Sequence, residues 1–236
     1  FAQPQTRRVL SDDLNPQRAF RATFTMERQL MKTIKLSATY SHSHSVDSRR
    51  VVNINAPLGG TFIPGLPTSG VRPLGQSAGN IMQTQSSGRV VGNSLNVNLN
   101  GNLRKMNFWA GYSFGKQRNT DGGTSGSPTD AYDFSNEWAR TNYSSLSFLY
   151  GGGYYEAPHG ISLNLFMIAN SGQPFNITTG SDTNGDTAFS ERPAFATDLA
   201  KPGVVVTPLG AFDPNPSAGQ QIIPRNFGRG PAYISV

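Results

Sequence analysis

A strict alternation of polar and apolar side chains organises this chain. It is clearest between residues 144 and 169, where two arms flank a tight turn at residues 156–160. In the second arm Leu163 and Leu165 fall on one face and Asn164 on the other. Successive side chains of an extended chain point to opposite faces, so this period predicts β-strands. We therefore expect residues 144–169 to form a hairpin.

The same alternation recurs along the whole chain. It predicts strands near residues 19–28, 33–41, 89–100, 105–115, 143–155, 160–170 and 231–236. Short turns join the two arms of each hairpin. Long segments rich in Gly, Pro, Ser and Asn follow each hairpin, the first from His42 to Ser87, and are expected to be loops. No stretch shows the apolar spacing of an amphipathic helix, so the expected fold class is all-β and antiparallel.

Hairpins with one apolar and one polar face suit either a soluble sandwich or a transmembrane barrel. Three features favour the barrel. The arms run about ten residues, enough for a tilted strand to cross a bilayer. All tight turns lie at one end of the hairpins and all long loops at the other. Aromatic residues gather near the arm ends, as interfacial girdles do: Phe20, Tyr40, Phe108, Phe114, Tyr143, Tyr154 and Tyr155.

We therefore expect a transmembrane β-barrel with short periplasmic turns, long extracellular loops and an interior lined by Ser, Thr and Asn. Low contents of hydrophobic (36%) and charged (14%) residues among the 236 fit such a lining. Six strands and the start of a seventh are too few to close a barrel, which needs about eight. Residues 1–236 are accordingly expected to be one partial barrel domain, a fragment of a longer chain. Gly151–Gly153 lies within an arm and indicates a bend or a close approach by a plug.

Composition also narrows the possible functions. The net charge of +6 comes from scattered basic residues with no long run, so no nucleic-acid partner is expected. The absence of cysteine excludes disulfides and thiolate metal sites. No apolar run approaches the about 20 residues of a membrane helix. We find no Ser-His-Asp spacing, paired carboxylates or phosphate loop, and we expect no enzyme.

Two sets of side chains are candidates for a site. Asp182, Asn184 and Asp186 have the alternating oxygen-ligand spacing of a calcium loop. However, Gly185 comes early and Glu191 stands at the tenth position instead of the twelfth. The pattern therefore also fits an Asx-rich turn whose side chains bond their own backbone.

The second set flanks the last loop and consists of Arg192, Arg225 and Arg229. These arginines suit contacts with a ligand or a plug. The interpretation that we favour is that they bridge loop acids such as Asp198 or Asp213. His42 and His44 would share a strand face, but without a third ligand they are expected to be solvated loop residues.

Three segments carry a family resemblance. They are the run from Ser171 to Gly180 with its continuation through residues 182–194, the run Arg225–Pro231, and residues 132–140. Together they resemble the C-terminal barrel of Oar-like TonB-dependent receptors, which carry a carboxypeptidase-regulatory-like domain at the N-terminus. The resemblance implies an outer-membrane barrel of about 22 strands, filled by a plug and energised by the TonB system. No segment of this chain resembles a plug or a TonB box.

The expected function is that of an outer-membrane receptor segment whose external loops capture a bulky ligand for uptake. Its expected partners are the lipid bilayer, the plug domain, the TonB system and that ligand. The alternatives are a non-transporting outer-membrane barrel for adhesion or secretion, and a soluble β-sandwich binding module.

Overall fold

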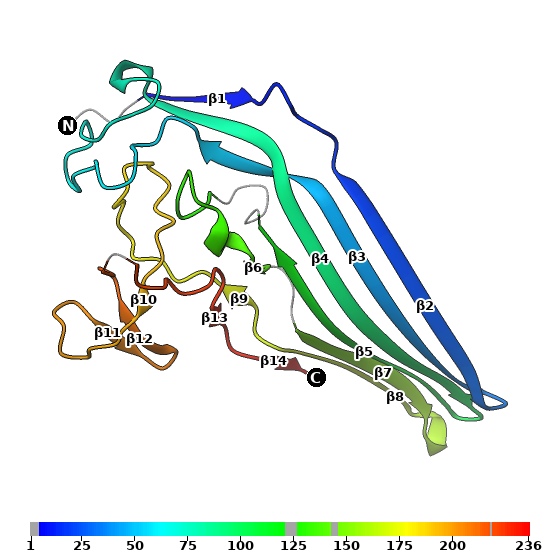
Figure 1. Ribbon diagram of the computed structural model, residues 1–236. Coiled ribbons are helices and arrows are strands. Elements are labelled where there is room, and N and C mark those ends of the chain that lie inside the picture. Colours follow the sequence, from blue (N-terminus) through cyan, green and yellow to red (C-terminus); the bar gives the residue numbers. More distant parts are fainter. Residues whose placement is uncertain (1–4, 121–126, 143–145, 218) are drawn as a thin grey trace.

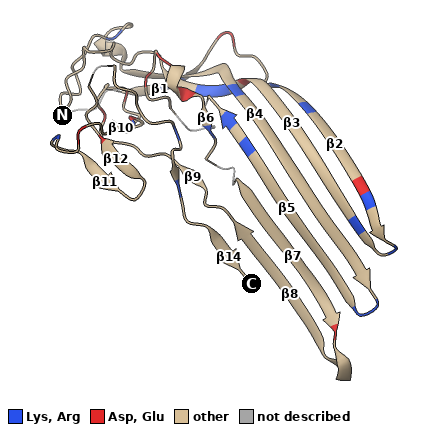
Figure 2. Ribbon diagram, turned by 60° about the horizontal axis from the view of Figure 1, so that its bottom comes forward, with Lys and Arg blue, Asp and Glu red and all other residues tan. Residues whose placement is uncertain are grey.

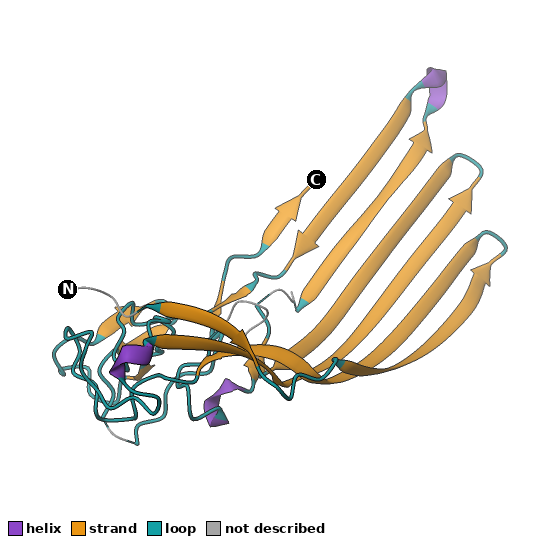
Figure 3. Cartoon of the chain, turned by 90° about the horizontal axis from the view of Figure 1, so that it is seen from above, coloured by secondary structure: helices purple, strands orange, loops and turns teal. Residues whose placement is uncertain are grey.

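A computed structural model describes residues 5–120, 127–142, 146–217 and 219–236. One long antiparallel sheet forms a curved wall, with the loops gathered at one end and tight turns at the other (Figures 1 and 3). Its strand order is β14-β8-β7-β5-β4-β3-β2, so β14 and β2 are the two edges. The all-β, antiparallel expectation is confirmed, and Tyr143 and Ser144 lie outside the described residues.

The strands along the wall are β2 (Arg18–Met31), β3 (Ile34–Asn53), β4 (Asn80–Leu103), β5 (Met106–Asn119), β7 (Ser147–Glu156), β8 (Ser162–Asn170) and β14 (Tyr233–Ser235). The wall strands β2, β3, β4 and β5, of 14, 20, 24 and 14 residues, are longer than ordinary globular strands. Two short strands lie beside this path: β1 (Thr6–Leu10), which pairs with β4 in parallel, and β6 (Ala139–Arg140), which pairs with β5.

Small sheets and single helical turns complete the described structure. One small sheet contains β10 (Ala194–Phe195), β12 (Gly210–Asp213) and β11 (Val205–Thr207); the other contains β9 (Pro174–Phe175) and β13 (Gly228–Arg229). The helices of the described residues are three 3-10 turns at Gln76–Ala78, Ser135–Glu137 and Pro158–Gly160. None of these is long and apolar enough to cross a membrane.

Register separates the wall into a polar and an apolar face. In the β3–β4 pair Leu36 stands opposite Leu99, whereas Ser37 stands opposite Asn98. None of the described segments covers the apolar face, and Phe24 on β2 is 69% exposed. Such a face needs an apolar surrounding, because large exposed apolar patches are rare in water. Figure 2 shows the charged residues of β4 and β5 near the loop end.

The pairing of β7 assigns Tyr150 to the polar face. Tyr150 stands opposite Gly111, and its hydroxyl donates to Asn98 Oδ1 at 2.9 Å. A Cβ on Gly111 would lie 2.2 Å from the Tyr150 ring, so this glycine makes room for the ring. Gly152 likewise lies under Trp109, where a Cβ would meet Cζ2 at 3.0 Å. Gly111 and Gly152 therefore make room for aromatic rings on the polar face.

Two strands are longer than the sequence predicted. The segment His42–Ser87 was expected to be a loop, but β3 continues to Asn53 and β4 begins at Asn80. Residues 42–50 and 83–88 of this extension are mostly polar on both faces, so the alternation that indicates a half-buried strand disappears there. A bulge around Asp47, whose φ is 60°, interrupts the pairing. Only the central part of 42–87 is a loop.

Candidate functional site in the clustered loops

The buried side chains of the described residues lie among the loops and at the adjoining ends of β3, β4 and β5, and not in the middle of the wall. Val52, Ala56 and Ala131 form a small apolar cluster against which Phe134 packs. The guanidinium of Arg50 lies 4.2 Å from the centre of the Phe134 ring. The loops thus pack against the extended ends of β3 and β4 as an ordered cap. We use the name loop cap for residues 54–79, 127–142 and 176–228.

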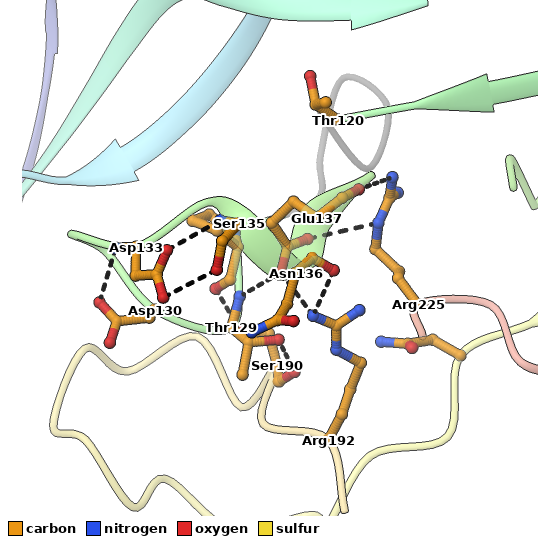
Figure 4. A network of polar contacts seen from close by, with 12 residues as sticks. Thr120, Thr129, Asp130, Asp133, Ser135, Asn136, Glu137, Ser190, Arg192 and Arg225 are labelled. Atoms are coloured by element: carbon orange, nitrogen blue, oxygen red, sulfur yellow. Dashed lines mark hydrogen bonds and ion pairs between the residues drawn. The ribbon is translucent and has the colours of Figure 1, made fainter. Parts of the chain in front are cut away.

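Glu137 lies at the centre of this loop cap (Figure 4). Its side chain is 3% exposed, and its Oε1 accepts a hydrogen bond from Arg192 Nη2 at 2.7 Å. The Arg192 side chain is fully buried. Burial lowers the pKa of Arg192, and nearby Arg225 lowers it further, while the Glu137 carboxylate acts in the opposite direction. Glu137 therefore stabilises a guanidinium that has no access to water.

Arg225 joins the same carboxylate from the far end of the chain. Its Nε lies 3.4 Å from Glu137 Oε2, and its Nη2 donates to Asn119 Oδ1 at 2.6 Å. The Asn119 carbonyl accepts from the same Nη2 at 2.8 Å. Glu137 thus contacts Arg192 and Arg225, which lie 55 and 88 positions further along the chain. Through Arg225 this network reaches Asn119 at the end of β5.

The partners of these arginines differ from those predicted. Both Arg192 and Arg225 bridge a loop acid, as the favoured interpretation held, but the acid is Glu137 and not Asp198 or Asp213. Asp213 pairs with Lys201 at 2.5 Å, and Asp198 Oδ1 accepts the Ala200 amide. The sequence offered Glu137 only as part of a resembling segment, without any signal of burial.

Arg229 lies apart from this ion cluster. It is half-buried at the edge of a cavity of about 330 Å³ that Lys116, Arg118 and Arg140 also line. Arg140 Nε donates to the Asn226 carbonyl at 2.7 Å, and burial together with Arg229 lowers the pKa of Arg140. The three predicted arginines therefore do not form one site.

Three carboxylates converge in the segment that the sequence marked as a possible calcium loop. One carboxylate oxygen each of Asp182, Asp186 and Glu191 lies within 4.8 Å of the others. Asn184 lies in the same turn, where its Oδ1 accepts the Asp186 amide at 2.9 Å and its Nδ2 donates to the Thr129 carbonyl. The structure thus adds Glu191 to the two acids that the sequence prediction named.

The Asx-turn alternative also describes this segment correctly. Asp182 Oδ1 accepts the Gly185 amide at 2.6 Å, and Asp186 Oδ1 accepts the Ala188 amide at 2.7 Å. Burial raises the pKa of Asp186 to about 7, with Glu191 and Asp182 adding to the rise against the hydrogen bonds of Ala188 and Asn184. Burial likewise raises the pKa of Glu191. The turn therefore brings acidic side chains together in a place where their ionised forms are poorly hydrated.

The two histidines lie on β3 and not in a loop, which corrects the prediction. A ring nitrogen of His42 is 2.9 Å from Asn93 Oδ1, and His44 Nε2 is 3.2 Å from Arg89 Nε. Among the described residues, neither histidine belongs to a cluster of three or more metal-binding side chains.

Comparison with known proteins agrees with this architecture. Residues 1–236 match the family model described as outer membrane beta barrel domain. The FrpB iron transporter from Neisseria meningitidis (F3-3 variant) is similar in structure, with a TM-score of 0.45 and 10% sequence identity over 71% of this chain. The alignment spans 21% of that transporter's chain. No curated protein matches the sequence. The chain belongs to the outer membrane beta barrel domain family and is an all-β protein of the cell outer membrane.

Proposed function

We propose that this chain is a wall segment of an Oar-like, TonB-dependent receptor that captures a bulky ligand at the cell surface and takes it up. The observation that carries the proposal is the ordered loop cap at one end of the wall, opposite an end that has only tight turns (Figure 3). Extracellular loops of outer-membrane barrels are the long ones, and periplasmic turns are short.

The loop cap has the rigidity that selective capture requires. Buried charges and backbone hydrogen bonds join loops that are distant in sequence, as at Glu137 and Arg192. Binding to a pre-organised surface costs less conformational entropy than binding to mobile loops. Arg192 and Arg225 would serve by holding this surface, and Arg229 would be the arginine available to a ligand.

The interior face suits a lumen that a plug fills. It is lined by Ser, Thr and Asn on β3 and β4 and by Trp109, Tyr150 and Phe166 nearer the turns. In the proposed mechanism the ligand binds to the loop cap, and the TonB system then drives rearrangement of the plug. The plug and the TonB contact belong to the whole receptor and enter here through the resemblance of the 171–194 and 225–231 segments.

The discriminating experiment is cross-linking in living cells. The full-length protein carrying an affinity tag is treated with formaldehyde and blotted for TonB. A TonB adduct that disappears when the TonB-contacting segment upstream is deleted supports the proposal. A barrel for adhesion or secretion has no need of that contact, so absence of the adduct at normal expression would refute uptake by this route.

A labelling experiment tests which side the loop cap faces. The sequence lacks cysteine, so single cysteines introduced at exposed positions report access directly. Ser181→Cys lies in the loop cap and Arg104→Cys in the β4–β5 turn. A membrane-impermeant maleimide added to intact cells should label the first and spare the second until the outer membrane is permeabilised. The reverse pattern would contradict the proposed orientation.

A further inference from the structure

We infer that Asp182, Asp186 and Glu191 form a binding site for a divalent cation, calcium by chemistry, that fastens the loop cap. The three carboxylate oxygens lie within 4.8 Å of one another. Oxygens that share one calcium ion at 2.3–2.6 Å can be no more than about 5 Å apart. The spacing therefore fits a common ion without rearrangement of the loop.

A second observation points to a missing partner. Glu191 is 6% exposed, and its Oε2 has no hydrogen-bond partner among the described residues. Its Oε1 accepts the Thr183 amide at 2.8 Å, which fixes the carboxylate in place. A buried acceptor without a partner destabilises the fold, and more so when it is charged. A cation held by this oxygen removes that destabilisation.

The charges around the cluster leave room for such an ion. The nearby cation is Arg72, which interacts electrostatically with Asp182 and Asp186. Its hydrogen bonds go elsewhere: Nη1 donates to the Asn55 carbonyl at 2.7 Å and Nη2 to the Gly185 carbonyl at 3.0 Å. Arg72 therefore leaves Glu191 Oε2 available for a metal, while oxygens of Asp182 and Asp186 also accept the backbone amides of Gly185, Thr187 and Ala188.

The donor set selects the class of metal. All three ligands are carboxylates, and neither Cys nor His belongs to the cluster. Hard oxygen donors suit calcium and magnesium, whereas sulfur and imidazole suit zinc and copper. Asp182 remains partly exposed, so water can supply further ligands on that side. Calcium accepts six to eight oxygens in flexible geometry, which matches an irregular loop better than the octahedron of magnesium.

The carboxylate cluster lies where several segments of the loop cap meet, so an ion bound there would stabilise their contacts. The turn that bears it is held by three other segments: Asn53 Nδ2 donates to the Asp186 carbonyl at 3.2 Å, Asn80 Nδ2 to Thr187 Oγ1 at 3.2 Å, and Asn184 Nδ2 to the Thr129 carbonyl at 2.9 Å. A bound cation would remove the mutual repulsion of the acids at this junction. Calcium outside the cell would therefore control how firmly the loop cap is closed.

Calorimetry on the purified full-length protein in detergent, stripped with chelator, tests the site directly. Titration with calcium chloride should show binding that Glu191→Gln and Asp186→Asn each weaken by at least about tenfold. Asp182→Asn, at the exposed side, serves as an independent variant if either of these fails to fold. Asp130→Asn is the matched control, since Asp130 lies in a neighbouring loop and accepts the Tyr132 amide.

Limited proteolysis separates a metal site from a merely structural acid. Glu191→Gln removes repulsion, so with chelator the variant should be cut within 176–192 more slowly than the parent. With calcium the order should reverse, because only the parent binds the ion. Equal calcium titrations of parent and Glu191→Gln, or cleavage that ignores calcium in both, would overturn the inference. The TonB adduct is a separate readout, so either proposal can fail without the other.

Discussion

Replacing Glu137 by Gln tests whether buried charge holds the loop cap together. The substitution keeps the shape of the side chain and an oxygen that accepts the Thr129 amide. It removes the negative charge that faces Arg192, whose side chain is fully buried, and Arg225, whose side chain is 7% exposed. Two guanidiniums then remain in a site of low polarity without a counter-ion.

The expected cost follows from that burial. Breaking a buried ion pair by removing one partner costs about 3–5 kcal/mol, because the remaining charge is uncompensated. Gln still offers a neutral acceptor to Arg192, so we expect the lower end, about 3 kcal/mol. At about 1.4 kcal/mol per factor of ten, the open state of the loop cap should become roughly 100- to 200-fold more populated.

Proteolysis of the folded protein in detergent measures this population. Cleavage within residues 176–192 tracks the opening equilibrium when the loops reclose faster than the protease cuts. Asp47→Asn is the matched control, because its ion pair with Arg18 is at the surface, with the arginine side chain 75% exposed. Surface pairs contribute about 0–1 kcal/mol, so the control should change cleavage by no more than about fivefold.

The double variant Glu137→Gln with Arg192→Met completes the test. Removing the Arg192 guanidinium should recover part of the lost protease resistance, because an apolar side chain can be buried there without a counter-ion. If Glu137→Gln accelerates cleavage no more than Asp47→Asn does, the ion cluster does not hold the loop cap and our reasoning fails.

Further predictions concern the wall. Val97→Arg on the apolar face near mid-height of the wall should lower folding stability in liposomes by about 2–4 kcal/mol, and Asn96→Arg on the polar face by much less. Leu163 lies one residue inside β8, beside the turn, so Leu163→Arg should cost only about 0–1 kcal/mol; equal costs at all three positions would refute the face assignment. Gly111→Ala should cost about 1–3 kcal/mol in the same assay by displacing the Tyr150 ring, and the cost should vanish in a Tyr150→Ser background.

Sequence periodicity identified the wall strands because each residue of such a strand is polar or apolar according to the face on which it lies. Leu36 and Ser37 reveal their faces by type alone, and the turn after Met31 shows where the chain reverses. Periodicity was insufficient where both faces contact polar surroundings, as around His42 and His44. Nor did it assign the faces of β7, because Tyr150 alternates as an apolar residue would but bonds to Asn98.

The site could be located from the sequence only in part. The acids at 182 and 186 follow one another closely, so their spacing indicated a ligand-bearing turn. Glu191 joins them because the chain folds back at Thr183, whose amide its carboxylate accepts. Such a contact depends on loop conformation, and no periodic rule encodes it.

The loop cap and the wall are stabilised by different interactions, which explains why only the wall could be predicted from the sequence. The wall has lipid as its apolar surrounding, so its side-chain pattern is set residue by residue. The loop cap has a small apolar cluster and must hold together in water, so it depends on buried charges such as Glu137 and Arg192. These two charges are tolerable in the interior only as partners, and they lie 55 positions apart in the sequence. Its stability should therefore respond to single charge substitutions and to cations far more than that of the wall does.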